Sequence, residues 1–314
     1  MDKIRVSVLT MTPEKTRGFL EIQEGIMNQR RKAVLMTVIA AIMWSSAGVF
    51  VKTVSMDTLA FVGGRGLIAG MVMLPMVFGA KPKFSWALVG GSIAYAAFTF
   101  CFIFATHLTT SANAVLLQYT SPIFVAVLSW AILKEKLTKQ DKICIAVSAV
   151  GMALFFCDNF GASSVWGNIV GIGSAITFSF TIIFLRLQKN GNPVYNVCFG
   201  SLLAGVIGLP ALLSSGIIME GGSALTGLLT TGLISGISYA LYAKSTTHLT
   251  AIESSLLPIL DPILNPVWVF LVVGERPGML SLLGGVIVLA AVVLRVLPLI
   301  LSGKETVSQE ATLQ

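Results

Sequence analysis

The chain has 314 residues, of which 55% are hydrophobic and only 11% are charged, and its mean hydropathy is +0.87. So little polarity excludes a soluble globular protein of this size and predicts an integral membrane protein. The net charge of +7 does not indicate a nucleic-acid partner, because the basic residues lie between apolar stretches and form no patch interleaved with aromatic residues.

The first thirty residues differ from the rest of the chain. They carry mixed charge and no sustained apolar run, and Met27 is followed by NQRRKAVLMTVIAA, which reads like the natural start of a membrane protein. No short apolar core with a small-residue cleavage site follows, so no cleavable signal peptide is expected. We expect residues 1–30 to be a disordered or spurious extension.

Ten apolar spans follow, each near the ~20 residues that a helix needs to cross the hydrocarbon of a bilayer. The predicted spans are residues 33–51, 58–79, 86–106, 113–133, 142–157, 166–185, 194–214, 224–243, 252–273 and 280–301. The connections are short, which leaves no room for a soluble domain. An even number of spans places both ends of the chain, including a tail over residues 302–314, on one side of the membrane.

The basic residues indicate which side that is. With the N-terminus in the cytoplasm, 18 of the 21 lysine and arginine residues fall in cytoplasmic segments. The outer loops then receive only Lys52 and Arg276, and Arg65 lies within a span. The positive-inside rule therefore predicts a multi-pass protein of the cytoplasmic membrane with both termini in the cytoplasm.

The ninth span contains features that a bilayer disfavours. Residues 251–277 carry Pro258, Pro262 and Pro266 at four-residue spacing and Asp261 in their middle. Each proline leaves a carbonyl without its helical donor, and an acid at this depth is costly unless it faces a cavity or a partner. We expect this interrupted helix to line a functional site.

The ninth span has a twin in the fourth. Residues 111–138 align with it so that Pro122 matches Pro262 and Glu135 matches Glu275. Similar matches in the same order relate the other spans, which predicts two repeats over residues 31–158 and 165–301. Five spans per repeat is an odd number, so the second repeat must enter the membrane inverted. The predicted fold is an all-α integral membrane protein with ten transmembrane helices in two inverted five-helix repeats, a recurring design of secondary transporters.

The two twin segments also resemble a known family. HLT…IESSLLPILDPILNPVWVFLVVGERPG and HLT…ANAVLLQYTSPIFVAVLSWAILKEKLT are similar to the EamA repeat of the drug/metabolite transporter superfamily, over about residues 31–301. The first copy departs from the family's Gly-Glu-Arg ending with Lys134, Glu135 and Lys136. The resemblance implies a permease with a central cavity between the halves, alternating access, and transport of a small organic metabolite, often as an amino-acid exporter.

Asp261 is the leading candidate for substrate binding and for coupling. Ser254, Asp261, Asn265 and Trp268 recur at i, i+7, i+11 and i+14, which places them on one face of a helix. Asp261 could pair with a substrate amine or change protonation during the cycle. The alternative is a structural acid bonded to a neighbouring helix.

Arg65 is the other charge inside a span. Its planar guanidinium could hold a substrate carboxylate or an acid in the cavity, and the alternative is that it extends toward the membrane interface.

Further candidates for the substrate site are polar and aromatic residues of other spans. The polar pair on the fourth span is Gln118 and Ser121, and the aromatic candidates are Trp44, Tyr95, Tyr119 and Tyr239. Aromatic walls with a few polar groups suit a small amphipathic ligand, although such residues also pack helices in membranes.

Other features predict structural roles. Glu253, which follows the possible helix cap Thr250, suits a helix N-terminus, and Glu135 is expected to brace a loop. The glycine pairs Gly66/Gly70, Gly167/Gly171 and Gly232/Gly236 predict close helix contacts.

The sequence therefore predicts a secondary active transporter of small organic metabolites, with amino acids or related compounds as the favoured class and export as the favoured direction. No nucleotide-binding loop, catalytic triad or metal cluster is apparent, so no cofactor, metal or enzymatic activity is expected. The expected partners are the substrate, the lipid bilayer and a coupling proton, with a monomer or homodimer as the assembly. The alternatives are a membrane-embedded enzyme acting on lipid or prenyl substrates, and a passive channel.

Overall fold

The fold consists of helices and short connections throughout the part of the chain that the structure describes. The computed structural model describes residues 13–51, 56–78, 84–109, 111–157, 165–214, 222–264 and 279–302. These residues contain no β-strand. The all-helical architecture predicted from the sequence is confirmed for them.

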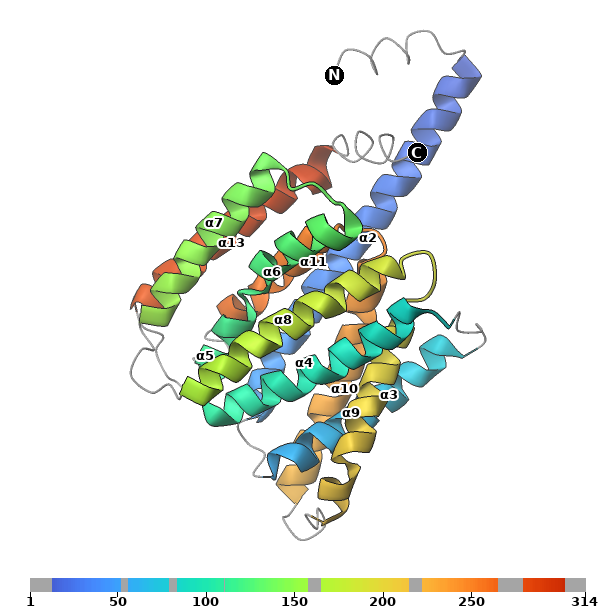
Figure 1. The fold of residues 1–314 in the computed structure, drawn as a ribbon. Coiled ribbons are helices and arrows are strands. Elements are labelled where there is room, and N and C mark those ends of the chain that lie inside the picture. Colours follow the sequence, from blue (N-terminus) through green and yellow to red (C-terminus); the bar gives the residue numbers. More distant parts are fainter. Residues whose placement is uncertain are drawn as a thin grey trace.

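The described helices can be followed in chain order in Figure 1. In the first half they are α2 (Pro13–Val51), α3 (Thr58–Val77), α4 (Trp86–Leu108), α5 (Ser111–Gln118), α6 (Ser121–Leu128) and α7 (Lys139–Cys157). In the second half they are α8 (Val165–Leu187), α9 (Val194–Ser214), α10 (Gly222–Ser245), α11 (Ala251–Leu256), a short helical segment over residues 260–264, and α13 (Met279–Ser302).

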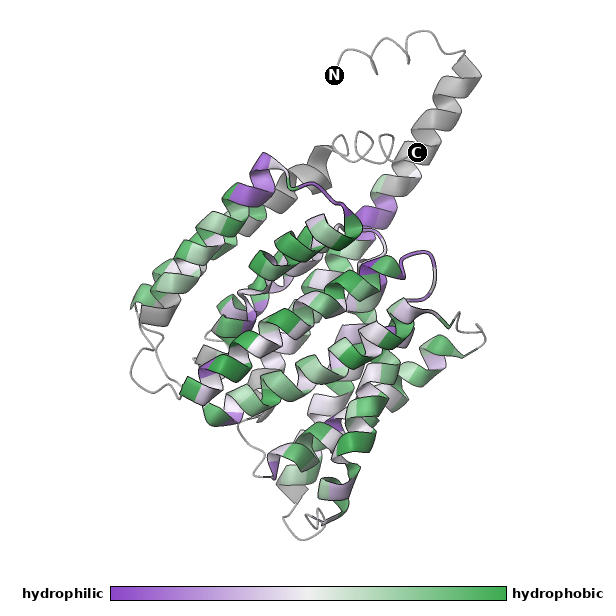
Figure 2. Cartoon of the chain, in the orientation of Figure 1, coloured by the Kyte–Doolittle hydropathy of each residue, from purple (hydrophilic) through white to green (hydrophobic). Residues whose placement is uncertain are grey.

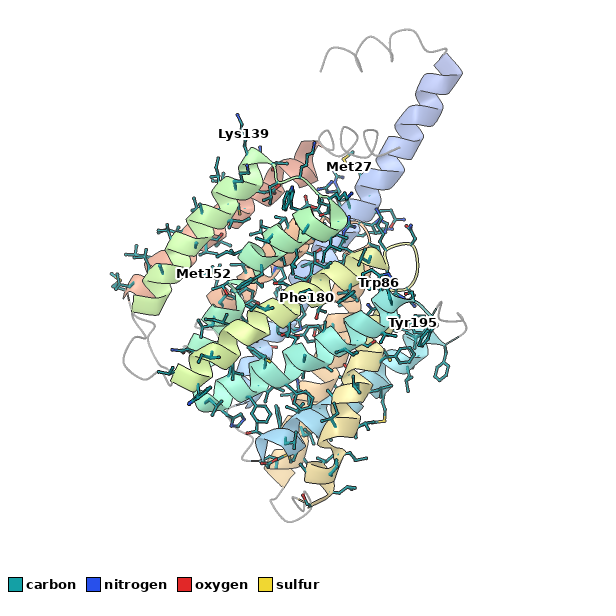
Figure 3. All side chains as sticks on the ribbon, viewed as in Figure 1. Met27, Trp86, Lys139, Met152, Phe180 and Tyr195 are labelled. Carbon is teal, nitrogen blue, oxygen red and sulfur yellow. The ribbon has the colours of Figure 1, made fainter. Side chains whose placement is uncertain are left out.

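Five of the described helices are long and apolar enough to cross a membrane. These are Thr58–Val77, Trp86–Leu108, Val165–Leu187, Val194–Ser214 and Ala224–Ser245. Large apolar side chains are also exposed on the outside of the bundle, among them Trp86 (Figure 3) and Trp166. An exterior of this kind suits lipid rather than water, so the chain is a multi-pass membrane protein.

Hydrophilic residues gather at one end of the bundle. Figure 2 shows them where α2 leaves the other helices, in the connection before α7 and at the start of α7, while the helices themselves are mostly hydrophobic. The start of α2 and the end of α13 lie at this same end (Figure 1). We call it the basic face, because it carries Arg30, Arg31, Lys134, Lys136, Lys139, Arg186 and Lys244.

The N-terminal part of α2 differs from the sequence expectation. The helix begins at Pro13 and continues without interruption to Val51, whereas residues 1–30 were expected to be a disordered or spurious extension. A helix already formed by the first apolar span propagates more readily than a new one nucleates, which gives a physical reason for the extension.

The fourth and ninth spans are interrupted, as the prolines predict. α5 ends at Gln118, and α6 begins at Ser121 with Pro122 in its first turn. α11 ends at Leu256 and passes through a 3₁₀ turn over Leu257–Ile259 that contains Pro258. Proline removes a helical donor and clashes with the preceding turn, so both breaks follow from the sequence.

Helix packing is symmetric when the two halves are exchanged. α3 packs on α9, and α7 packs on α13. The contact of α4 with α8 has its counterpart in α10 with α2, and the contact of α4 with α9 has its counterpart in α10 with α3. These contacts among the long described helices therefore match one another when each helix is exchanged for its predicted equivalent.

The glycine pairs provide close approaches between the halves. A Cβ on Gly63 would lie 2.6 Å from the backbone of Gly208, and one on Gly66 would lie 2.7 Å from the carbonyl oxygen of Ser201. The order of these contacts shows that α3 and α9 run antiparallel, since residue numbers rise along one helix as they fall along the other. The predicted role of Gly66 in close packing is confirmed.

Candidate functional site

The two interrupted helices meet at Asp261. The hydroxyl of Tyr119, in the break between α5 and α6, donates a hydrogen bond of 2.8 Å to Oδ2 of Asp261. Tyr119 is 1% exposed, whereas Asp261 is only partly buried. The acid therefore has a neutral partner from the other half of the chain and some accessible surface.

Arg65 points into the bundle. Its Nε donates a hydrogen bond of 2.8 Å to Oγ of Ser235, which lies near the middle of α10. A side chain extended toward the membrane interface would not reach that position, so the inward alternative describes this structure. The side chain is partly exposed, as Asp261 is.

Tyr239 lies near enough to both charged side chains to feel their electrostatic influence. The Arg65 guanidinium and the Asp261 carboxylate both act on its phenol. Arg65 acts also on Tyr95, and Asp261 acts also on Tyr119. We call Arg65, Ser235, Tyr239, Tyr119 and Asp261 together the central polar site.

Among the described residues, Arg65 and Asp261 take part in no ion pair. Within the described segments, Arg65 forms its hydrogen bond with Ser235 and Asp261 forms its hydrogen bond with Tyr119, whereas the ion pairs join other residues. Charged residues of this kind are costly to retain inside a membrane protein, which makes Arg65 and Asp261 candidate functional positions.

An aromatic cluster adjoins the central polar site. The ring of Trp44 lies 4.7 Å from that of Tyr239, which in turn lies 4.9 Å from Tyr95, centroid to centroid. Trp44 also packs edge-on against Tyr242 at 5.2 Å. The indole nitrogen of Trp44 is buried and has no hydrogen-bond partner among the described residues. Predicted wall residues from α2, α4 and α10 are thus brought together.

Gln118 and Ser121 flank the break in the fourth span rather than following one continuous helix. Both are buried. The carbonyl oxygen of Ser121 accepts a hydrogen bond of 3.1 Å from the hydroxyl of Ser179, while its own Oγ has no partner within the described chain. Two other predicted site residues, Asn265 and Trp268, lie outside the described residues.

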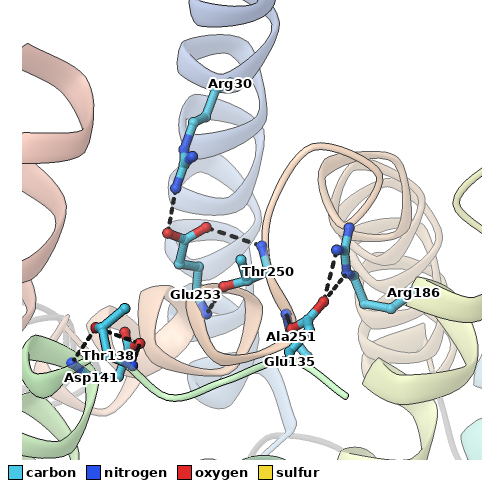
Figure 4. A network of polar contacts seen from close by, with 8 residues as sticks. All are labelled: Arg30, Glu135, Thr138, Asp141, Arg186, Thr250, Ala251 and Glu253. Atoms are coloured by element: carbon cyan, nitrogen blue, oxygen red, sulfur yellow. Dashed lines mark hydrogen bonds and ion pairs between the residues drawn. The ribbon is translucent and has the colours of Figure 1, made fainter. Parts of the chain in front are cut away.

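A second group of polar contacts surrounds the N-terminus of α11 (Figure 4). Glu253 forms an ion pair with Arg30 of α2, and Glu135 forms one of 2.9 Å with Arg186 of α8. Thr250 and Glu253 complete a capping box, which confirms the capping role predicted for Glu253. We call Arg30, Glu135, Arg186, Thr250 and Glu253 the α11 ion-pair network.

Some residues and pairings of the central polar site and of the α11 ion-pair network were not predicted from the sequence. The partner of Arg65, Ser235, belongs to a stripe in which Thr231, Ser235 and Ser238 recur at i, i+4 and i+7, so the polar face of α10 was visible in principle. No sequence signal pairs Tyr119 with Asp261 or Arg30 with Glu253, because each pair is separated by more than one hundred residues along the chain.

The described residues contain no group of three or more His, Cys, Asp or Glu side chains that could hold a metal ion.

Comparison with known proteins places these features in a family. The family described as "EamA-like transporter family" matches the chain twice, over residues 31–157 and 165–297. One similar protein is an uncharacterized transporter of Archaeoglobus fulgidus, 22% identical over 82% of this chain and 93% of its own length. Another is the pseudopaline exporter CntI of Pseudomonas aeruginosa, 23% identical over 85% of this chain and 96% of its own length.

The chain is also similar to a solute carrier over part of its length and to one solved structure. Solute carrier family 35 member G1 of Mus musculus is 24% identical over 48% of this chain and 46% of its own length. A crystal structure superimposes with a TM-score of 0.72 at 16% identity and covers 84% of this chain and 96% of that chain. At this identity the likeness concerns the fold alone.

Proposed function

Because the chain belongs to the EamA-like transporter family, we propose that it is a secondary active transporter of amino acids or related zwitterionic metabolites, which it exports across the cytoplasmic membrane. The relatives named above are described as transporters, an exporter or a solute carrier. These names favour transport over the two alternatives, a lipid-modifying enzyme and a passive channel.

The observation that carries the proposal is the pair of opposite, unneutralised charges in the central polar site. Arg65 keeps its terminal nitrogens for a planar anion, and Asp261 keeps one carboxylate oxygen for a cation. An arginine fork matches a carboxylate, and a carboxylate matches an ammonium group. A substrate with both groups would satisfy both charges at once, with its apolar part against Trp44 and Tyr95.

Asp261 also supports coupling to protons. A carboxylate that binds the substrate's ammonium group can instead bind a proton, and the two cannot occupy the same oxygen together. Competition of this kind would exchange a proton for the substrate across the membrane. Tyr119 would hold the carboxylate in place through either state.

The symmetric packing supports two inverted five-helix repeats and ten membrane crossings. α3 and α9 are equivalent helices and run antiparallel, as an inversion requires. α7 and α13 are also antiparallel. Cys144 contacts the carbonyl oxygen of Ala291, whereas Gly151, further along α7, lies against Gly284, which comes earlier in α13. Rocking of one repeat against the other would then expose the central polar site to each side in turn.

The test is uptake of labelled amino acids into proteoliposomes, with and without an imposed proton gradient. We expect saturable uptake that the gradient accelerates. Matched competitors sharpen the result: an amino-acid amide lacks the carboxylate, and an N-acetyl amino acid lacks the ammonium group, so both should compete at least tenfold more weakly than the parent. Equal competition by all three would contradict the two-charge site.

A further inference from the structure

The α11 ion-pair network joins the two halves of the chain at the basic face. Arg30 of α2 belongs to the first half and pairs with Glu253 of the second. Glu135, which follows the interrupted fourth span, belongs to the first half and pairs with Arg186 of the second. Both pairs therefore cross the boundary between the halves, and they do so with opposite polarity (Figure 4).

Both pairs converge on one connection of the second half, residues 246–250, and on the helix that follows it. Arg186 donates a hydrogen bond of 3.0 Å to the carbonyl oxygen of Thr246, and Glu135 accepts one of 3.0 Å from the backbone N–H of Ala251. Glu253 accepts one of 3.0 Å from the backbone N–H of Thr250. The start of α11 is thus held by a carboxylate from each half, at the helix end that favours negative charge.

One pair of the network is buried and the other is partly buried. Glu253 is 2% exposed and Arg30 is 9% exposed, whereas the side chains of Arg186 and Glu135 are 11% and 21% exposed. A buried charge that loses its partner is strongly unfavourable unless water reaches it. The two pairs therefore favour the arrangement in which this face is closed, and they can separate only if the surroundings become hydrated.

The network lies in line with the central polar site. Ser254, the residue after Glu253, is completely buried, and Asp261 follows Glu253 by eight residues on the same interrupted helix. Eight residues correspond to about 12 Å along a helix. Along this interrupted helix, the start of α11 therefore lies between Asp261 and the basic face.

We infer that the α11 ion-pair network is the gate of the basic face, closed in this structure, and that opening separates both ion pairs together. The inference rests on the proposed transport function, because an alternating transport cycle requires this face to open. In an alternating cycle the first half moves relative to the second, so some contacts that cross the boundary must break at the face that opens, and both ion pairs lie at the basic face.

The gate can be tested without any substrate. In a background whose native cysteines are replaced, Ser254→Cys is a thiol directly behind the network. A membrane-impermeant maleimide applied to the basic face should label it slowly in the otherwise unchanged protein. In Glu135→Gln and in Arg186→Gln, labelling should be at least tenfold faster, since each variant weakens the closed state.

Two controls separate gating from general loosening. Lys244→Gln removes an exposed charge from the last turn of α10 at the same face and should leave labelling unchanged. The double variant Glu135→Gln/Arg186→Gln should label no faster than the faster single variant, because both substitutions break one pair. All variants are compared as monodisperse protein after size-exclusion chromatography.

A second measurement distinguishes opening of the gate from local unfolding, which would also accelerate thiol labelling. Spin labels at Lys136 and Lys244, which are exposed on opposite halves, report the separation of the halves by pulsed electron resonance. We expect a longer-distance population in Glu135→Gln that is minor in the parent. Unchanged labelling and unchanged distances in both single variants would overturn the gate. Faster labelling without uptake of any amino acid would support the gate and contradict the proposed substrate class instead.

Discussion

The α11 ion-pair network and the central polar site differ in whether their charged side chains have oppositely charged partners. In the network each carboxylate has a guanidinium partner, Glu253 with Arg30 and Glu135 with Arg186. In the central polar site the partners of Arg65 and Asp261 among the described residues are hydroxyl groups, from Ser235 and Tyr119. Paired charges hold parts of the chain together, whereas charges that the chain leaves unpaired are available to a ligand or a proton.

This contrast predicts that transport and stability respond to different substitutions. Removing an unpaired charge should impair transport and spare the fold, because no partner is left behind. Removing one member of a buried pair should weaken the fold, because the other member remains buried without compensation.

The largest effect is expected for Asp261→Asn. The amide keeps the size of the side chain and its contact with Tyr119, but it loses the negative charge that would bind an ammonium group or a proton. Loss of about 4 kcal/mol, the scale for a desolvated charge pair, lowers the uptake rate roughly 1,000-fold. Uptake into proteoliposomes and thermal unfolding in detergent are measured together, and we expect an unchanged melting temperature. Uptake and gradient dependence equal to those of the parent would contradict the assignment.

The next effect is expected for Glu253→Gln, on stability. Glutamine can still complete the capping box with Thr250, so the substitution removes mainly the ion pair with Arg30. Breaking a buried pair costs about 3 kcal/mol, which should lower the melting temperature in detergent. Lys32→Gln, which removes an exposed charge from the same face, is the matched control. A melting temperature no lower than that of the control would mean that the pair contributes nothing.

A smaller effect on uptake is expected for Arg65→Gln. The amide retains a hydrogen bond to Ser235 but cannot form a bidentate contact with a carboxylate. Loss of about 2 kcal/mol corresponds to a roughly 30-fold weaker apparent affinity. The decisive measurement is discrimination: competition by the amino-acid amide, which lacks the carboxylate, should equal that of the parent amino acid in this variant alone. Retained discrimination would place the carboxylate elsewhere.

The smallest effect is expected for Tyr119→Phe. This substitution removes only the hydroxyl that donates to Asp261, and a hydrogen bond to a charged group contributes about 1.5 kcal/mol. We expect uptake to fall roughly tenfold. Tyr242→Phe, whose hydroxyl donates to the carbonyl oxygen of Ser254 instead, is the control for loss of a buried phenol. Equal effects of the two substitutions would indicate packing rather than a specific contact with Asp261.

Much of the architecture was predictable because it depends on local physics. Three features follow from neighbouring residues alone. They are the apolar runs of membrane length, the helix breaks at Pro122 and Pro258, and the cap formed by Thr250 and Glu253. The duplication was visible for the same reason, since aligned motifs survive in the order of the chain. Arg65 and Asp261 could also be singled out from the sequence, because a charged side chain within an apolar span is energetically costly.

The partners of these charges were decided by the tertiary structure. Arg65 and Asp261 could each have paired with the other, with the interface or with a neighbour, and composition does not rank those outcomes. Ser235 and Tyr119 became their partners because α10 and the broken fourth span are placed beside them by helix packing. The sequence by itself therefore determined a duplicated membrane protein with two costly charges and two broken helices. Only long-range packing, through contacts more than one hundred residues apart along the chain, decided which charges are neutralised at the basic face and which remain available in the centre.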